Sequence, residues 1–162
     1  MKLVVTSAAL LCALSLNTFA NEQLVSVSNT DVAFNGSTTQ VVKVNYDTDT
    51  NQTTSGLGLA IYFNSKHVSV DINNTLREGL LAQSQVMQDS DNADGDSATD
   101  SKVVIAWASM SDNWPTAINT TLFDLALTKV SNTEHSRSQV NIKPTQTAVG
   151  YTAAEQTILV QN

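Results

Sequence analysis

The chain has 162 residues, a length that fits one domain. Its fifteen Asp and Glu residues against eight Lys and Arg residues give a net charge of −7. So acidic a surface disfavours nucleic acid and anionic membranes as partners.

The first twenty residues differ in character from the rest. Lys2 precedes a mostly apolar stretch at residues 3–16, and small residues then lead up to Ala20. This order of features is typical of a secretory signal peptide, with cleavage between Ala20 and Asn21. The apolar stretch is too short to span a bilayer, which needs about 20 apolar residues. We therefore predict a signal peptide at residues 1–20.

The mature chain would be a single domain at residues 21–162. Processing removes Lys2, so seven basic residues face fifteen acidic ones and the net charge becomes −8. It also removes Cys12, the sole cysteine, which excludes a disulfide and a cysteine-based zinc site. We expect a secreted protein, either periplasmic or extracellular, that does not insert into the membrane.

Short apolar segments alternate with polar residues along the mature chain, and Asn, Asp, Ser and Gly separate them. This pattern is typical of strands and turns. Residues 76–87 are the one stretch that suggests a helical turn or irregular structure. Eight or nine strands with one buried face predict an all-β fold, an antiparallel β-sandwich. The predicted strands are residues 24–28, 40–46, 56–63, 67–72, 102–109, 120–130, 138–142 and 157–160.

The segment at residues 56–63 is the clearest strand. Its large apolar side chains alternate with Gly58, Ala60 and Tyr62, which point to the opposite face. Small residues on that second face predict the close approach of another group.

Five of the fifteen carboxylates lie in one twelve-residue stretch. Calcium takes six to eight oxygen ligands, which proteins supply from closely spaced carboxylates on a flexible turn, and Gly95 would permit a tight bend. The spacing does not follow the EF-hand pattern. We predict a calcium-type loop; the alternative is a solvated acidic loop that binds ions weakly. The predicted metal ligands are Asp89, Asp91, Asp94, Asp96 and Asp100.

Motifs for catalysis are scarce. The chain lacks a nucleophile elbow, a zinc-protease helix and a phosphate-binding loop, and its two histidines, His67 and His135, are isolated in sequence. We expect no enzymatic activity and no catalytic residues.

Aromatic side chains offer a second route to binding, because a flat ring stacks on a sugar or anchors a protein interface. Tyr62 and Trp114 are the candidate ligand-binding residues. Trp107 shares its face with apolar neighbours and is expected in the core. Trp114, before Pro115, could equally close one end of the sandwich.

The order of these segments resembles the cohesin domains of bacterial cellulosomes and their non-cellulosomal relatives. The resemblance covers most of residues 24–160. It is most specific where the Asp-rich stretch is followed by Val-Val-Ile-Ala-Trp-Ala at residues 103–108, Asn-Trp-Pro at 113–115 and Thr-Leu-Phe at 121–123.

The resemblance implies a jelly-roll of about nine strands and a binding role. Cohesins bind dockerin modules through one sheet face, and the calcium in those complexes belongs mainly to the dockerin. The Asp-rich loop departs from that pattern. The fold is shared with carbohydrate-binding modules, so it does not by itself assign a function.

Two binding functions therefore follow from the sequence. The first is a cohesin-like module that docks a dockerin-type or other protein partner through a sheet face that includes Tyr62. The second is a carbohydrate-binding module that recognises polysaccharide through exposed aromatic rings. A row of exposed rings would favour polysaccharide, whereas a flat face of small, polar and aliphatic groups would favour protein.

Overall fold

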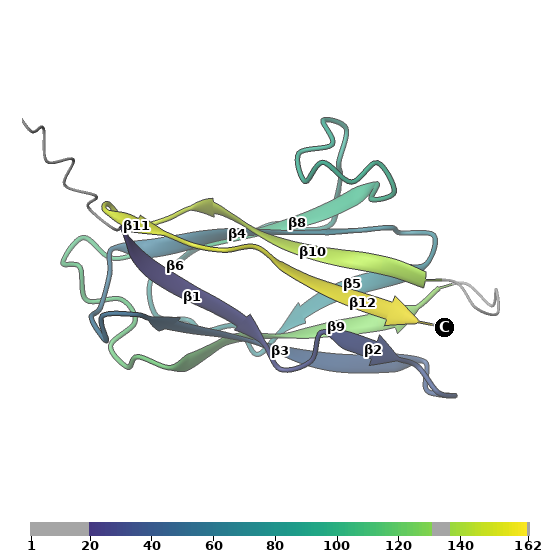
Figure 1. The fold of residues 1–162 in the computed structure, drawn as a ribbon, viewed down its shortest axis with the longest axis horizontal. Helices are drawn as coiled ribbons and strands as arrows, with labels where there is room; N and C mark the ends of the chain where they lie inside the picture. The colour runs from purple at the N-terminus through teal and green to yellow at the C-terminus, as the bar shows by residue number, and fades with distance from the viewer. Residues whose placement is uncertain (1–19, 131–136, 162) are drawn as a thin grey trace, which may run out of the picture.

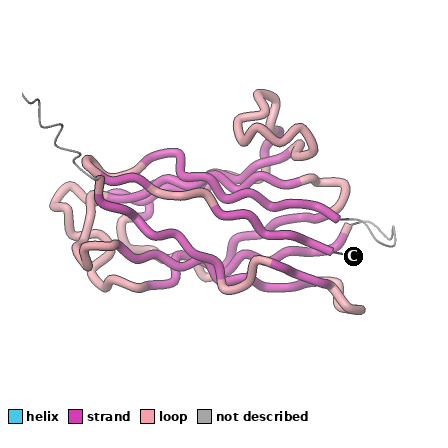
Figure 2. The backbone as a smooth tube through the Cα atoms, in the orientation of Figure 1, coloured by secondary structure: helices cyan, strands magenta, loops and turns pink. Residues whose placement is uncertain are grey.

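The computed structural model describes residues 20–130 and 137–161. Within those residues the chain forms strands and loops and no helix, as Figure 2 shows. The strands are β1 (Asn21–Val27), β2 (Asp31–Ala33), β3 (Thr39–Thr48), β4 (Gly56–Phe63), β5 (Val68–Asn73), β6 (Leu80–Gln83), β7 (Met87–Gln88), β8 (Ser101–Ala108), β9 (Thr120–Lys129), β10 (Arg137–Gln146), β11 (Tyr151–Thr152) and β12 (Gln156–Gln161).

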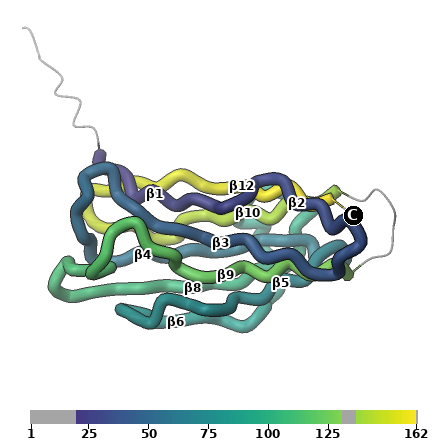
Figure 3. Tube along the Cα trace, turned by 90° about the horizontal axis from the view of Figure 1, so that it is seen from below, coloured from purple at the N-terminus to yellow at the C-terminus, as the bar shows by residue number. Residues whose placement is uncertain are grey.

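The strands form two sheets that pack face to face (Figure 1). One sheet has five strands in the order β11-β1-β3-β9-β5. The other has seven strands: six in the order β2-β12-β10-β4-β8-β6, and β7, which also pairs with β8. Strand β6 therefore lies at one edge of the molecule beside β8, as Figure 3 shows.

The N-terminal segment connects the two sheets. Strand β1 pairs with β3 in the five-stranded sheet, and β2 then pairs in parallel with β12 in the seven-stranded sheet. Apart from this contact and the parallel pair β1–β11, the strand pairs are antiparallel. The architecture is an antiparallel jelly-roll β-sandwich, as predicted.

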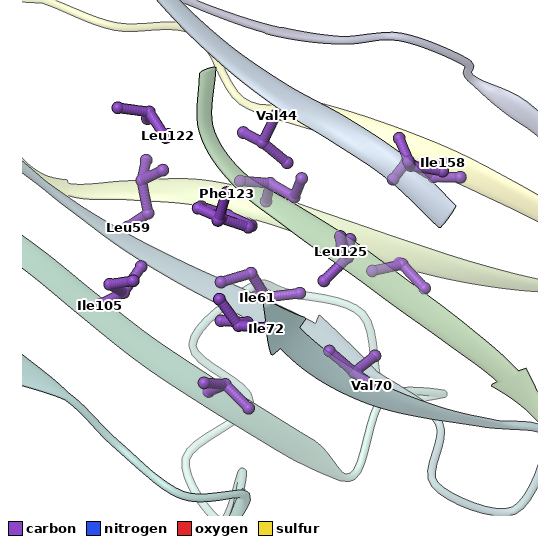
Figure 4. Packing of buried hydrophobic residues seen from close by; sticks show 14 of the residues in the cluster. Val44, Leu59, Ile61, Val70, Ile72, Ile105, Leu122, Phe123, Leu125 and Ile158 are labelled. Atoms are coloured by element: carbon purple, nitrogen blue, oxygen red, sulfur yellow. The ribbon is translucent and has the colours of Figure 1, made fainter. Parts of the chain in front are cut away.

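The core lies between the sheets, where alternate side chains of facing strands interdigitate (Figure 4). Leu59 and Ile61 of β4 meet Phe123 and Leu125 of β9 in this layer, and all four are fully buried. Leu122 is buried as well, although strict alternation would turn it outward. The β3–β9 register shifts between Val44 and Asn45, and this bulge places two successive β9 residues in the core.

The eight strands of six residues or more agree closely with the segments predicted from alternation, and β4 has the predicted bounds. The four additional strands have only two to four residues. Of these, β6 lies within residues 76–87 and β7 begins at Met87. The expected helical turn there is wrong, because β6 and β7 pair with β8 and extend the sheet, whereas the alternative of irregular structure holds for residues 76–79 and 84–86.

The predicted signal peptide lies almost wholly outside the described residues, and Asn21, which follows the predicted cleavage site, is the first residue of β1. His135 also lies outside the described residues. Among the described residues, no helix has the length and apolar character needed to cross a bilayer.

Candidate functional site: the outer face of the seven-stranded sheet and its acidic loop

The outer face of the seven-stranded sheet carries a row of side chains that crosses five strands. Tyr62 of β4 is opposite Lys102 of β8 on one side and Asn141 of β10 on the other. Met87 of β7 and Thr157 of β12 extend the row at its two ends. Because paired residues on adjacent strands point the same way, these side chains project away from the core.

The acidic loop, defined here as residues 89–100, connects β7 to β8 on this outer side, where it projects beside β8 in Figure 1. At its base, the Asp89 N–H donates to the Asp100 carbonyl at 2.9 Å, which continues the β7–β8 ladder. Asn64 donates its side-chain N–H to the Ala98 carbonyl at 2.7 Å. These bonds attach the loop to the end of β4 as well as to β8.

Two side chains of the row hold the loop in place. The Lys102 ammonium donates to Asp89 Oδ1 at 3.0 Å and to Asp91 Oδ1 at 2.9 Å. Asn141 donates to Asp94 Oδ2 at 2.9 Å. Lys143, which is two residues after Asn141 on β10 and points to the same face, donates to the Asp94 backbone carbonyl at 2.9 Å. The loop is therefore fastened over the row that contains Tyr62.

Three of the five predicted metal ligands have separate partners in this arrangement. Asp94 accepts from Asn141 and from the Thr99 hydroxyl, and Asp96 accepts from the Ala98 N–H. Asp100 accepts from both the N–H and the hydroxyl of Ser65. Within residues 20–130 and 137–161, no three acidic, His or Cys side chains are grouped closely enough to hold a metal ion.

Asp89 and Asp91 are the exception to this separation, because they share the Lys102 ammonium. The Asp89 side chain is 0 % exposed, and its Oδ2 has no hydrogen-bond partner. The Asp91 side chain, by contrast, is 67 % exposed. Hydrogen bonds from Lys102 and with Asp89 hold the pKa of Asp91 below its usual value, and bonds to Asp91 and Asp89 raise the pKa of Lys102.

The two aromatic candidates are both buried. Tyr62 faces outward as predicted, but it is only 5 % exposed because it lies in the row beneath the acidic loop. Burial raises the pKa of its hydroxyl, with Lys102 opposing that effect. Trp114 is 0 % exposed, because its ring packs on Trp107 and Tyr46 and its N–H donates to the Glu78 carbonyl at 2.9 Å. Neither ring is presented to a ligand from solvent in this conformation.

The other aromatic side chains of the described residues are also buried, except that of Tyr151, which is partly exposed. A row of exposed rings, which would favour polysaccharide, is therefore absent from the described part of the chain.

The part of the outer face along β6 and β8 is apolar. Val104 and Ala106 of β8 point outward and are partly exposed, and Ala82 of β6 pairs with Ala106. Leu81 and Met87 at the neighbouring edge are 70 % and 42 % exposed. We call these five residues the apolar patch. This patch was not predicted from the sequence because β6 is short and bulged, although Leu80-Leu81-Ala82 after Gly79 was an available signal.

The small residues of β4 make room for a neighbouring strand. A Cβ on Gly58 would lie 2.7 Å from the Thr145 hydroxyl of the bulge in β10. The close approach predicted from Gly58 and Ala60 is thus made by a neighbouring strand of the same sheet.

A groove of about 610 Å³, with both polar and apolar walls, lies on the other side of the acidic loop, between that loop and the ends of β10 and β12. Asp96, Arg137, Gln139 and Leu159 contribute to its walls. His67 also lines it, and its Nδ1 is buried without a hydrogen-bond partner. Sequence reasoning did not identify this groove, because its residues come from four separate segments.

No protein-family model and no curated protein matches this chain. Several solved structures, however, match this chain. The seventh ScaB type I cohesin from Pseudobacteroides cellulosolvens matches with a TM-score of 0.53 and 7 % identity, over 86 % of this chain and 92 % of the cohesin. The module CaCohA2 from Clostridium acetobutylicum matches with a TM-score of 0.52 and 16 % identity, over 87 % and 91 % of the two chains.

A third structure is the sixth cohesin of scaffoldin B from Acetivibrio cellulolyticus, solved in complex with a mutant Cel5 dockerin. Its TM-score is 0.50 and its identity 16 %, over 86 % of this chain and 98 % of the cohesin. The chain therefore has a cohesin-like fold, in agreement with the resemblance identified from the sequence.

Proposed function

We propose that this chain is a secreted, non-catalytic binding module that docks a protein partner through the outer face of β4, β6, β8 and β10. The observation that carries the proposal is the apolar patch. Its side chains come from β6, β7 and β8 on one side of the sheet, where Leu81 and Met87 are largely exposed and Val104 and Ala106 are partly exposed. Exposed contiguous apolar surface on a soluble domain marks an interaction site.

The partner we propose is of dockerin type. The support is the shared fold together with the Acetivibrio cohesin, which is in complex with a dockerin. The burial of the aromatic rings also favours a protein over a polysaccharide, because sugar recognition by stacking needs a ring that is open to solvent.

Two further parts of the proposal rest on the sequence. The apolar segment before Ala20 supports secretion by a cleaved signal peptide. The concentration of carboxylates at residues 89–100 supports a calcium-type loop beside the docking face.

A matched pair of variants tests the docking face. Val104→Glu places a carboxylate in the apolar patch, and Val41→Glu places one on the outer face of the five-stranded sheet, where Val41 is 59 % exposed. A partner is first captured on the immobilised mature chain from the secretome of its source organism, identified by mass spectrometry, produced in pure form and titrated calorimetrically.

We expect Val104→Glu to weaken binding at least tenfold and Val41→Glu to change it less than twofold, because an unpaired charge buried in an interface is costly. The proposal is overturned if the Val41 variant alone weakens binding. It is also overturned if the chain is retarded only in polysaccharide-containing gels, which would assign carbohydrate binding instead.

A further inference from the structure

The acidic loop crosses over the ring of Tyr62. On one side of the ring, two carboxylates of the loop accept hydrogen bonds from the Lys102 ammonium. On the other side, Asp94 accepts a hydrogen bond from the Asn141 amide. Lys102 and Asn141 are the residues that pair with Tyr62 on β8 and β10, so the loop spans the ring between its points of attachment. An outward-pointing tyrosine is therefore only 5 % exposed.

Hydrogen bonds and ion pairs, rather than apolar packing, attach this loop to the sheet. Its apolar side chains, Ala93 and Ala98, are exposed, and its two buried residues, Asp89 and Thr99, are polar. A segment with few buried apolar contacts opens locally at low cost, because water replaces most of what a polar contact contributes. The closed arrangement also has a cost of its own, since Asp89 Oδ2 is buried without a hydrogen-bond partner. The loop thus has the features of a segment that detaches while the sheet stays folded.

The surface beneath the loop continues the proposed docking face. Met87 belongs both to the row that contains Tyr62 and to the apolar patch. Lys102 and Val104 are two residues apart on β8, so they point to the same side of the sheet. A tyrosine ring beside aliphatic side chains is typical of an interface core, where tyrosine is enriched. The row is therefore a part of the docking face that the closed loop covers.

We propose that the acidic loop is an internal competitor for docking: it occupies the docking face around Tyr62, and the protein partner displaces it and binds there. This inference rests on the proposed docking function and adds a covered surface and a conformational step to it. Because the closed loop excludes the partner, the apparent affinity is reduced in proportion to the fraction of molecules that are open. Weakening the attachment of the loop should therefore tighten binding, which is the opposite of what most substitutions near an interface do.

The first measurement needs no partner, because the three tyrosines of the chain report on the loop by themselves. Tetranitromethane nitrates accessible phenolates, and mass spectrometry gives the rate at each ring of the folded mature chain. Tyr151 is partly exposed and should react fastest, whereas Tyr46 is buried in the core and reacts only when the whole domain unfolds. Local opening of the loop predicts that Tyr62 reacts about tenfold or more faster than Tyr46 in the wild type.

A matched pair of variants links that rate to the loop. Asn141→Asp places a carboxylate against that of Asp94 and should open the loop by repulsion. We expect it to raise the nitration rate of Tyr62 about fivefold or more, although added negative charge by itself disfavours the reactive phenolate. Asn45→Asp is the control, because Asn45 also accepts a hydrogen bond from a threonine hydroxyl but lies in the five-stranded sheet. It should change the rate less than about twofold, since exposed charges this far apart are largely screened. If Asn141→Asp does not fold, Asn141→Ala removes the same hydrogen bond without a charge. A Tyr62 rate no faster than that of Tyr46, or one that the Asn141 variant does not raise, overturns the proposal.

The second measurement titrates the purified partner from the docking experiment into variants of the loop, which leave the sheet face intact. Asp94→Ala removes the acceptor for Asn141, whereas Asp96→Ala removes the same charge but only a hydrogen bond within the loop. We expect Asp94→Ala to tighten binding about threefold or more and Asp96→Ala to change it less than about twofold. Tyr62→Thr should weaken binding about tenfold, because it removes the covered ring from the interface.

Unchanged affinity in Asp94→Ala or in Tyr62→Thr would show that the loop does not compete for this face, and would overturn the proposal. The docking function and the loop opening fail separately. The nitration rates contain no partner, so they decide whether the loop opens even if docking fails. A closed loop, in turn, leaves the result of the Val104→Glu titration untouched.

Discussion

The side-chain amide of Gln23 donates a hydrogen bond of 2.8 Å to the hydroxyl of Tyr46 in the fully buried interior. The same amide donates to the Gly56 carbonyl of β4 at 2.9 Å, and its oxygen accepts the Ala148 N–H at 2.8 Å. Gln23 belongs to the five-stranded sheet and Gly56 to the seven-stranded one. One polar side chain therefore fastens the two sheets together near one end of the sandwich.

Replacement of Gln23 should be costly even when the shape is kept. Gln23→Leu leaves the Gly56 carbonyl and the Ala148 N–H buried without partners, and each such group costs about 1–3 kcal/mol. We expect a total loss of about 2–5 kcal/mol in the free energy of unfolding, measured by urea denaturation. Tyr46→Phe, which removes one hydroxyl, should cost about 1 kcal/mol. A Gln23→Leu protein within 0.5 kcal/mol of the wild type would contradict this account.

We expect Trp114 to stabilise the folded state through its buried packing rather than to bind a ligand. Its ring centroid lies 5.6 Å from that of Trp107 and 4.8 Å from that of Tyr46. Trp114→Ala opens a large cavity and should lower the unfolding free energy by about 3–5 kcal/mol. Tyr151→Ala, at a partly exposed ring, should cost much less. If Trp114→Ala kept full stability and lost partner binding, the ring would instead be a ligand-binding residue.

Alternation in the sequence was sufficient to predict the long strands because their core-facing apolar side chains recur at every second position over most of each strand. Leu57, Leu59 and Ile61 are buried on one face of β4, and Val103 and Ile105 are buried on β8, as that pattern requires. The short strand β6 could not be found in this way. Its pairing with β8 is interrupted by a bulge between Leu80 and Ala82, which breaks the period of two.

The candidate site was harder to predict because its geometry depends on contacts between distant segments. The concentration of carboxylates was visible in the sequence, but their partners were not. Lys102 stands at the start of a strand and Asn141 lies 47 residues beyond Asp94. Only the register of β4, β8 and β10 brings these side chains to the acidic loop, and it is the same loop that covers Tyr62.

Acid should weaken the folded state through aspartates that are hydrogen-bonded within it. Bonds from Asn74 and Lys43 hold the pKa of Asp124 below its usual value of 3.8, and Lys102 and Asp89 do the same for Asp91. For Asp100, burial acts to raise the pKa, but hydrogen bonds from Ser65 and Ser101 together with the charge of Lys66 outweigh it. A carboxyl with a depressed folded-state pKa stabilises the protein above about pH 4, and this contribution is lost as the pH falls through the folded-state pKa.

Comparison with Asp124→Asn isolates that effect from the general relief of negative charge on acidification. We expect the wild type to be the more stable protein at pH 7 and the difference in urea midpoint to shrink toward pH 2–3, because protonated Asp124 resembles its amide. A difference that stays constant or grows on acidification would show that Asp124 is not stabilised as a carboxylate in the folded state.

Gly79 precedes β6 and should tolerate no side chain. Its φ is +67°, in the left-handed region, and a Cβ there would lie 2.8 Å from the Ala108 carbonyl oxygen and 2.8 Å from Trp114 Cδ1. The left-handed conformation costs an L-residue about 1–2 kcal/mol, and overpacking against a backbone atom adds about 1–3 kcal/mol. We expect Gly79→Ala to lower the unfolding free energy by about 2–5 kcal/mol in urea denaturation.

Gly150 separates these two contributions. Its φ of +81° is similar, but nothing lies within 4 Å of a Cβ built there, so Gly150→Ala should cost only the conformational part, about 1–2 kcal/mol. Equal losses in the two variants would mean that the contacts of Gly79 with Ala108 and Trp114 are not tight in solution. A larger loss at Gly79 would support the packing of β6 against β8 and Trp114, and with it the position of Leu81 and Ala82 in the apolar patch.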